Sequence, residues 1–432
     1  MKTNRIKTLL TAVLISLSAS ISAYDFTVDG LYYNIVSLED LTCEITREIG
    51  YDYTGDIVIP ETVTYNNKTL TVVKISDKAF YYCTEMSSIT IPNSITDIGE
   101  EAFENCSALT SIIIPNTVKH LGKSAFMNCS NLEDVTLSNS LESISDYTFY
   151  KCSLLKNISI PNSVNQIGEY AFHHCYNLAN VIIPNSVTKI NNHAFTNCYK
   201  LTQVTIPSSV LYIGDYTFYY CNNLTEIIIE DGNDFLEFES FWADVAFNRE
   251  STVFLYCPLK SVYIGRNIKV SPKGNYDYKS LFINIGTLEK VSVGNMVTKI
   301  NENMFSGCYS LKEISLGNSV NEIGTDAFKE CSNLSTIYTL NQTPPIVENE
   351  TFTNKIYINT NLYVPKGSLA AYQTADVWKN FWNIQEYSPE TGIGSITVGS
   401  GKEDKIYDLQ GRKLETPQHG INIINGKKVL VK

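Results

Sequence analysis

The residues that could do chemistry in this chain are its five histidines and eleven cysteines. Only His173 and His174 are adjacent histidines, and no cysteine or carboxylate lies at a spacing that would complete a metal site around them. The motifs G-x-S-x-G, G-x-G-x-x-G and the Walker phosphate loop are absent from the sequence. The sequence therefore predicts no catalytic residue, no metal site and no cofactor.

The cysteines are evenly spaced rather than clustered. They recur every 23 residues in two runs, and a phenylalanine three residues before each of them keeps the same period. The first run is Cys83, Cys106, Cys129, Cys152, Cys175, Cys198 and Cys221, and the second is Cys308 and Cys331. A fixed period of about 20 to 50 residues is typical of a solenoid, in which each repeat forms one coil of a stack.

Such a stack would place the cysteines in a column. Equivalent residues of adjacent coils lie about 4.8 Å apart with parallel Cα–Cβ bonds, whereas a disulfide needs Cβ atoms about 3.8 Å apart on bonds that converge. We therefore predict buried, reduced thiols that act as small apolar fillers. Cys43 and Cys257 are out of phase with the period, and this interpretation leaves them open as exceptions.

Each coil follows the pattern L-x-x-I-x-I-P-N-S-V-x-x-I-G-x-x-A-F-x-x-C. The alternating apolar residues predict a short strand, and the following proline, such as Pro115, ends it. Gly122 indicates a position with positive φ, for which Asn191 stands in within its own coil. The positions of His173 and His174 are mostly polar in other coils, so we expect both imidazoles to be solvated.

The unit I-P-N-S-V-x-x-I-G-x-x-A-F-x-x-C resembles the BspA-type leucine-rich repeats of bacterial surface proteins, especially Bacteroidetes-like ones. The resemblance covers about residues 75–385. It implies a β-rich α/β solenoid, built as a curved, right-handed stack of about twelve 23-residue coils with a cap at each end. It also implies a secreted or cell-surface protein that binds other molecules along an extended surface.

The chain divides into segments on this interpretation. Basic residues, then an apolar run, then small residues are the pattern of an export signal at the N-terminus. The segments are a signal peptide at 1–23, an N-terminal β cap at 24–74, leucine-rich repeats at 75–340, a C-terminal capping repeat at 341–387, a linker at 388–401 and a small β unit at 402–432.

Two coils are longer than the others, with insertions near residues 231–252 and 270–278. By register we place Tyr256 at the cysteine position of the first long coil and Ile285 at that of the second. The first insertion carries an aromatic run between residues 235 and 247. This run is either an exposed anchor for a partner or the local core of the insertion.

The C-terminal region is expected to have two parts. Residues 362–384 predict a short amphipathic helix within the cap, and the final β unit predicts two or three strands with turns at Gln410-Gly411 and Asn425-Gly426. This unit is similar to the C-terminal sorting domains of Bacteroidetes secreted proteins, in which YDLxGR and a terminal KVLVK recur. The similarity implies recognition by secretion or surface-attachment machinery, and a plain β unit is the alternative.

The charge balance limits the classes of partner. The chain has 33 Lys+Arg against 45 Asp+Glu, a net charge of −12, whereas nucleic acids and anionic lipids need clustered basic residues. We therefore exclude nucleic acid as a main partner. No segment reaches about 18 consecutive apolar residues after the signal, so we predict no transmembrane segment. The expected location is extracellular or on the outer cell surface, with the periplasm as the alternative.

Two surfaces are candidates for binding. The outward residues of the strand face are small and favour β structure, which suits either a binding face or an ordinary exposed sheet. The second surface carries aromatic residues close to the core phenylalanine or just after the cysteine, where they suit sugar rings or a protein hot spot. The predicted ligand-binding residues are Tyr147, Tyr150, Tyr170, Tyr176, His193, Tyr199, Tyr216, Tyr219 and Tyr220. The alternative is a ladder of rings that only stabilises neighbouring coils.

The sequence as a whole predicts an adhesin-like protein that binds a host or bacterial surface protein or glycan without catalysis. A structural component of the cell envelope that has no soluble ligand is one alternative. A hydrolase is a second and less favoured one, and it would be expected to depend on His173 or His174.

Overall fold

The computed structural model describes residues 24–243, 250–273, 280–348, 350–388, 406–407, 413–414, 420–424 and 427–431. The chain forms two compact units, Met1–Tyr387 and Ser388–Lys432. The predicted signal peptide, almost all of the predicted linker and the two predicted turns of the final unit lie outside the described residues.

The N-terminal part of the larger unit consists of two groups of strands. The first three strands form an antiparallel meander, and two later strands form a hairpin whose turn residues Asn66 and Asn67 have φ of 50° and 60°. Positive φ at both central residues is the geometry that two-residue hairpins favour. The strands are β1 (Phe26–Val28), β2 (Leu31–Ser37), β3 (Thr42–Thr46), β4 (Gly55–Val58), β5 (Thr62–Tyr65) and β6 (Lys68–Ile75).

The coils that follow carry two ladders of short parallel strands. Strand partners in the regular coils are 23 residues apart, as Asn157 and Asn180 are on one ladder and Gln166 and Lys189 on the other. The N-terminal strands continue into these ladders, because β6 pairs with β8 and β4 pairs with β7.

The strands of the first ladder are β7 (Met86–Thr90), β9 (Ser111–Ile113), β11 (Asp134–Thr136), β12 (Asn157–Ser159), β14 (Asn180–Ile182), β16 (Gln203–Ile206), β18 (Glu226–Ile229), β21 (Ser261–Ile264), β23 (Lys290–Val293), β25 (Glu313–Leu316), β27 (Thr336–Thr339), β29 (Asn361–Pro365) and β30 (Asn383–Tyr387). Those of the second are β8 (Asp97–Ile98), β10 (His120–Leu121), β13 (Gln166–Ile167), β15 (Lys189–Ile190), β17 (Tyr212–Ile213), β19 (Leu236–Ala243), β22 (Ile268–Lys273), β24 (Lys299–Ile300), β26 (Glu322–Ile323) and β28 (Ile346–Val347). On the first ladder the burial alternates as predicted, with Ile112 inside and Ser111 and Ile113 outside.

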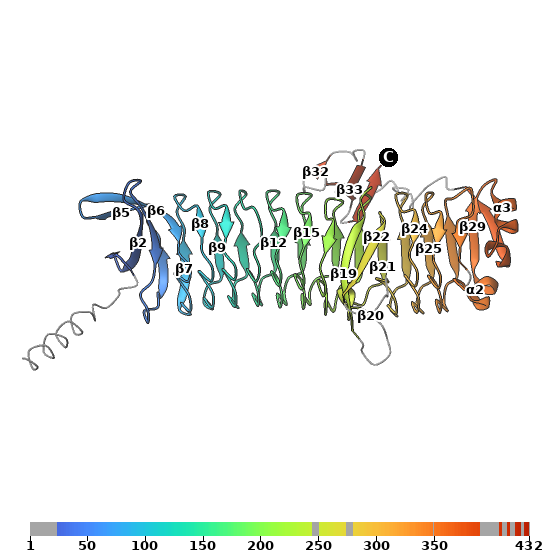
Figure 1. Cartoon of the computed structure of the whole chain (residues 1–432), viewed down its shortest axis with the longest axis horizontal. Helices are drawn as coiled ribbons and strands as arrows, with labels where there is room; N and C mark the ends of the chain where they lie inside the picture. Colours follow the sequence, from blue (N-terminus) through green and yellow to red (C-terminus); the bar gives the residue numbers. More distant parts are fainter. Residues whose placement is uncertain are drawn as a thin grey trace, which may run out of the picture. The chain divides into compact units, whose positions relative to one another are not determined.

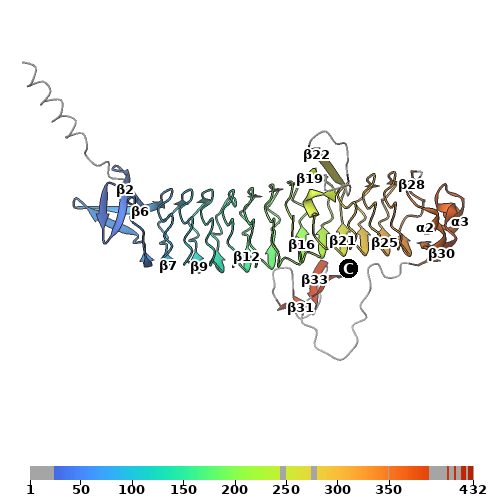
Figure 2. The same cartoon turned by 90° about the horizontal axis from the view of Figure 1, so that it is seen from below.

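The row of coils in the larger unit runs almost straight in both views, where curvature was expected (Figures 1 and 2). A leucine-rich repeat stack curves when helices, which pack about 8–10 Å apart, lie opposite strands that are about 4.8 Å apart. Here the return leg of each regular coil is made of turns and two-residue strands. Both sides of the coil therefore stack at a similar spacing, and the α/β character expected of the repeats is not found in the described coils.

The centre of the stack is a column of phenylalanine rings. Successive rings lie face to face, with centroids 5.1–5.7 Å apart and interplanar angles of 2–12°. The column consists of Phe80, Phe103, Phe126, Phe149, Phe172, Phe195, Phe218, Phe254, Phe282, Phe305, Phe328 and Phe352. The predicted core column is therefore confirmed, and it passes through both long coils.

The cysteines do more than fill space beside this column. Nine thiols donate a hydrogen bond to the carbonyl oxygen of the core phenylalanine one coil earlier, at 2.9–3.3 Å from sulfur to oxygen. For example, Cys175 Sγ donates to Phe149 O, which also accepts from the backbone N–H of Cys152. An apolar residue at the cysteine position could not donate the first of these two hydrogen bonds. All eleven cysteines are buried and free, including Cys43.

The register assigned to the first long coil was wrong by one residue. Cys257 Sγ donates to Phe218 O, so Cys257 and not Tyr256 occupies the cysteine position. The error arose because Pro258 alone separates this cysteine from Leu259, whereas two residues separate the cysteine and leucine of regular coils. Ile285 takes the cysteine position of the next coil as predicted, because Phe282 three residues earlier lies in the ring column.

The glycine that recurs four residues before the core phenylalanine in several coils has a different role from the one expected. Gly122 and Asn191 do not have positive φ. A Cβ atom on Gly122 would instead lie 2.4 Å from the backbone of Gly99 in the preceding coil, so glycine is needed for the close approach of two coils. Positive φ occurs at two other positions, two residues before and two residues after the core phenylalanine, as in Tyr147 and Lys151.

The two insertions pair with each other, which the sequence did not indicate. β19 and β22 are parallel partners over six residue pairs, and Lys269 Nζ lies 3.0 Å from Glu237 Oε2 across them. β20 (Glu250–Ser251) and the short helix η1 (Thr252–Phe254) return the chain to the core. Two additions that are separate in sequence therefore make one extended ribbon on the second ladder.

The C-terminal cap was predicted to contain one short amphipathic helix between residues 362 and 384, and a six-residue helix with Tyr372 buried lies there but covers only part of this segment. The segment contains β29, α3 (Leu369–Thr374), η2 (Trp378–Asn380) and β30, and a second helix, α2 (Asn354–Asn359), precedes it. The cap closes the ring column, because Phe352 contacts the rings of Trp378 and Phe381 at 6.0 and 5.3 Å. The Trp378 indole N–H donates to Pro345 O.

The smaller unit contains one antiparallel sheet with the strand order β32-β31-β33-β34. It has four strands rather than two or three, because short pairings at Ile406–Tyr407 and Lys413–Leu414 add to the longer hairpin. The strands are β31 (Ile406–Tyr407), β32 (Lys413–Leu414), β33 (Gly420–Ile424) and β34 (Lys427–Val431).

Replacing a ring in the middle of the column tests how much the column contributes to the stability of the fold. Phe149→Ala removes a fully buried ring that stacks on Phe126 and Phe172, and we expect it to lower the free energy of unfolding by about 3–5 kcal/mol. The exposed strand residue Thr136 provides the control, since Thr136→Ala should change stability by no more than about 0.5 kcal/mol. Urea unfolding of both variants measures the difference, and equal effects would contradict a continuous core.

The cysteine column predicts protected thiols. Burial raises the pKa of the Cys331 thiol to about 12, and the pKa of the Cys152 thiol is also raised by burial and by the neighbouring Cys175. Few thiolates exist at pH 8, and the sulfurs are enclosed. We expect iodoacetamide to modify none of the eleven cysteines of the folded protein and all of them in guanidinium chloride. Rapid alkylation of the folded chain, measured by mass spectrometry, would contradict this prediction.

Candidate functional site

The structure brings all nine predicted binding residues together. Their rings, joined through His173 and His174, form one connected group that we call the aromatic strip. Four members lie two residues before the core phenylalanine and stack face to face along the coils: Tyr147–Tyr170 at 4.8 Å, Tyr170–His193 at 4.4 Å and His193–Tyr216 at 4.8 Å between centroids. These four residues have φ of 53–57°, a left-handed conformation that is uncommon outside glycine.

The remaining members extend the strip on the other side of the phenylalanine. Tyr150 contacts Tyr147 at 5.6 Å and stacks on His173 at 5.1 Å, and His173 and His174 meet edge to face at 4.1 Å. His174 contacts Tyr176, which stacks on Tyr199 at 4.9 Å. At the other end Tyr216 contacts Tyr219 at 5.1 Å, and Tyr219 contacts Tyr220 at 4.6 Å. The strip is therefore continuous from ring to ring.

His173 and His174 were expected to be solvated, and this is wrong for His173, whose side chain is buried with 9% exposed. Tyr150 stacks on its ring, and the ring of His193 in the next coil lies 6.2 Å away. Burial first, and nearby positive groups second, lower the pKa of His173 to about 3. Burial likewise lowers the pKa of His193 to about 4 and, together with Lys151, lowers that of His174.

The strip is uncharged at neutral pH. Its histidines are neutral for the reason given above, and burial raises the pKa of the Tyr219 hydroxyl to about 12. Two lysines lie over rings at its border, with Lys123 Nζ 5.4 Å from the Tyr147 centroid and Lys151 Nζ 5.3 Å from that of Tyr150. Since neighbouring rings cover each other's faces, a partner would meet mainly ring edges and hydroxyl groups.

The strand face has a different character. Its exposed apolar side chains are isolated, as Ile113 and Ile182 are, with 70% and 68% exposed. Several of its charges pair between neighbouring coils, for example Lys156 with Glu133 at 2.5 Å and Lys312 with Glu289 at 2.7 Å. Charges that already neutralise each other offer little to a partner, so the aromatic strip is the stronger candidate.

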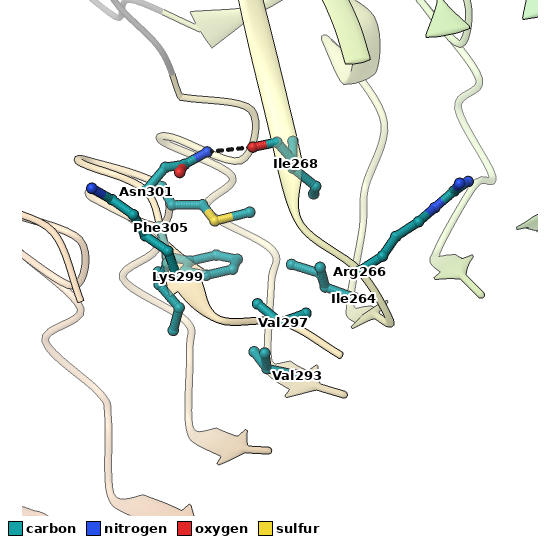
Figure 3. A pocket seen from close by; sticks show the side chains of 10 residues that line it. Ile264, Arg266, Ile268, Val293, Val297, Lys299, Asn301 and Phe305 are labelled. Carbon is teal, nitrogen blue, oxygen red and sulfur yellow. Dashed lines mark hydrogen bonds between the residues drawn. The ribbon is translucent and has the colours of Figure 1, made fainter. Parts of the chain in front are cut away.

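A cavity inside the stack can be set aside. Figure 3 shows the space between the second long coil and the coil after it, lined by Ile264, Val293 and Phe305, with Asn301 Nδ2 donating to Ile268 O. Its volume of about 10 Å³ is close to that of a single water site. The Arg266 side chain points away from it, and its guanidinium donates to the carbonyl oxygens of Pro207 and Ser208. The buried cation thus ties coils together.

The described part of the chain shows neither a candidate metal site nor a helix that could span a membrane. No group of three or more histidine, cysteine or acidic side chains there could hold a metal ion. None of the helices described is both long and apolar enough to cross a membrane. Of the aromatic run in the first insertion, Phe235 is exposed and Phe238 is buried in the core, and the side chains of Phe241, Trp242 and Phe247 lie outside the described residues.

The buried histidines predict that the fold weakens in mild acid. His173 and His193 have lowered pKa values when folded, so between about pH 4 and pH 6.5 the unfolded chain binds more protons than the folded one. Stability should therefore be full above pH 6.5 and fall as the pH drops to 5. Replacing both by tyrosine should flatten this slope, since tyrosine occupies the position of His193 in both adjacent coils and that of His173 in the preceding coil. Melting temperatures at pH 7 and pH 5 measure it, and equal slopes in both proteins would contradict it.

A comparison with protein families identifies the type of repeat. The family model of the BspA type leucine rich repeat region (six copies) matches this chain over residues 57–157, 142–276 and 278–372. A leucine rich cell surface protein from Faecalibacterium prausnitzii is 25% identical, with 85% of this chain and 98% of that chain covered and a TM-score of 0.47. A leucine-rich repeat protein from Bacteroides ovatus is 24% identical, with 79% and 100% covered and a TM-score of 0.41.

A leucine rich repeat protein of T. pallidum is 23% identical, with 66% of this chain and 90% of that chain covered and a TM-score of 0.33. A comparison with curated proteins finds no match. The repeat model spans well over half of the chain, from the end of the N-terminal strands into the C-terminal cap. The chain therefore belongs to the family of proteins built from BspA-type leucine-rich repeats.

Proposed function

We propose that this protein is exported and binds a surface protein or glycan of host or neighbouring cells, in the manner of an adhesin and without catalysis. The observation that carries the proposal is the aromatic strip, in which nine tyrosine and histidine side chains predicted from register form one connected, half-buried group. Tyrosine is enriched among the residues that dominate binding energy at protein interfaces.

The mechanism is surface complementarity spread over several coils. The stacked members of the strip lie on four successive coils, so their ring edges recur every ~4.8 Å along the stack, and three of the four carry a hydroxyl group. A partner can contact several of them at once, and each pair contributes little alone. Because the rings are already ordered by stacking, binding costs little additional side-chain entropy. An extended protein segment or a glycan chain that lies along the strip satisfies this arrangement.

Export and attachment belong to the same proposal. The sequence pattern of residues 1–23 supports export, and the similarity of residues 402–432 to sorting domains supports recognition by secretion or surface-attachment machinery. We also infer right-handed coiling of the stack, since connections between parallel strands are right-handed in about 98% of cases. A structural role in the cell envelope is the alternative, and it would leave the strip as a purely stabilising ladder.

The strip is tested by removing three of its stacked rings together. Tyr147→Ser, Tyr170→Ser and Tyr216→Ser in one variant should weaken binding to a partner found by screening residues 24–432 against host and bacterial surface proteins and glycans. We expect a loss of at least about 10-fold, since each lost ring contact contributes about 0.5–1.5 kcal/mol.

The control separates binding from stability. Tyr338 and Tyr363 stack at 4.9 Å on the strand face, so Tyr338→Ser and Tyr363→Ser together remove a similar ring pair far along the chain. If the triple variant melts earlier but binds with unchanged affinity, the strip is a stabilising ladder and the proposal fails. If only the triple variant loses affinity, with both variants folded by circular dichroism, the strip is the binding surface.

A further inference from the structure

Next to the strip, the coil of Phe282 has no tyrosine at two surface positions that carry tyrosine in several other coils. The first lies two residues after the core phenylalanine and holds Tyr220 and Tyr256 in successive coils, but Asn284 in the next one. The second lies just after the cysteine, or just after Ile285 in this coil, and holds Gly286, whereas the following coil has Tyr309 there. The coil of Phe282 therefore lacks both surface rings, as the coils of Phe103, Phe126, Phe149 and Phe328 also do, but here the gap lies between Tyr256 and Tyr309 of the neighbouring coils.

The missing rings leave a hollow of about 480 Å³, a volume within the range of about 300–1,000 Å³ that is usual for ligand sites. Ile285 and Leu281 are among the residues at its base, and Tyr256 and Tyr309 are among those at its edge. The core beneath it is intact, because Phe282 stacks on Phe254 and Phe305 like any other ring of the column. The departure from the repeat is confined to the surface.

The tyrosines here are more exposed than those of the strip, although Tyr256 still stacks on Tyr220 with ring centroids 4.3 Å apart. Tyr256 has 46% of its surface exposed and Tyr309 has 58%. Tyr309 lies directly on Gly286, since a Cβ on that glycine would come within 2.3 Å of the tyrosine hydroxyl oxygen and 2.4 Å of Cζ. Because Gly286 has no side chain, one face of the Tyr309 ring packs against the backbone of the Phe282 coil. The other face is then on the solvent side.

The lining of the hollow indicates the chemistry of its ligand. Among the described residues that line it, none carries a formal charge at neutral pH. Amide and hydroxyl groups of Asn222, Asn284 and Thr287 stand among apolar and aromatic side chains. An uncharged lining disfavours phosphate, sialic acid and charged peptides, because each would lose hydration without gaining an opposite charge. Thr287 Oγ1 already donates to Leu259 O, but a purely apolar ligand would displace water from the exposed amide of Asn222 without replacing its hydrogen bonds.

We propose that this hollow binds a neutral hexopyranose unit of a glycan, with Tyr256 and Tyr309 as aromatic platforms. A pyranose presents apolar C–H faces to an aromatic ring and hydroxyl groups to amides, which is the combination that the lining offers. The proposal goes beyond the strip and does not depend on it, because the hollow uses different residues except for Tyr220 at its border.

Saturation-transfer NMR of the full mature chain with cellohexaose, maltohexaose, mannohexaose and chitohexaose tests the proposal. We expect transfer to at least one of these neutral sugars and none to the anionic hexamer of galacturonic acid. In Tyr309→Ala the affinity for the sugar that binds should fall about tenfold. Gly286→Ala should reduce it as well, since the added methyl group displaces the ring of Tyr309 from its seat.

Tyr82→Ala is the matched control. Tyr82 occupies the position of Tyr256 in the first coil, with a similar φ of 62° against 64° and 50% of its surface exposed, and it does not line the hollow. This variant should bind as the parent protein does. Absence of transfer from all four neutral sugars, or equal loss in Tyr82→Ala and Tyr309→Ala, would overturn the proposal. The triple variant of the strip should keep this sugar binding, so the two proposals can fail separately.

Discussion

Face-to-face stacking of the core phenylalanines is the interaction on which the rest of this structure depends. Rings 5.1–5.7 Å apart set a coil spacing close to that of strands in a sheet. The same spacing brings nine cysteine thiols to the carbonyl oxygen of the phenylalanine one coil earlier, and it brings Gly122 so close to Gly99 that a Cβ atom would not fit there. Because both sides of each coil keep this spacing, no difference in spacing between the two sides bends the stack.

This spacing also determines what the surface can present. Any aromatic side chain that recurs at one position of the repeat lies within stacking distance of its copies, so the rings of the strip cover each other's faces. Stacking orders these side chains, and their burial lowers the pKa values of His173 and His193. A surface built in this way is long and rigid, and it suits extended partners better than small ones.

The sequence predicted whatever depends on the period alone. Register identified the phenylalanine column in the regular coils, the inward side of the strands and all nine predicted residues of the strip, because each follows from counting 23 residues, but it missed Phe254 in the first long coil. Features that depend on local geometry were missed. Cys257 was displaced by the one-residue shortening at Pro258, and the burial of His173 depends on the ring of Tyr150 in the preceding coil. The pairing of β19 with β22 joins insertions that no periodic signal connects.

In such a stack, coils that follow the repeat closely are poorly suited to bind small ligands. A coil that follows the repeat satisfies its own surface, since its rings, amides and charges find partners in the next coil. A free aromatic face needs a neighbouring coil that lacks the matching ring, and such a gap is tolerable only if the core column continues beneath it. The coil of Phe282 meets both conditions, with Asn284 and Gly286 at the surface and Phe282 in the column. We therefore expect the irregular coils of such stacks, rather than their most regular stretches, to hold sites for compact ligands.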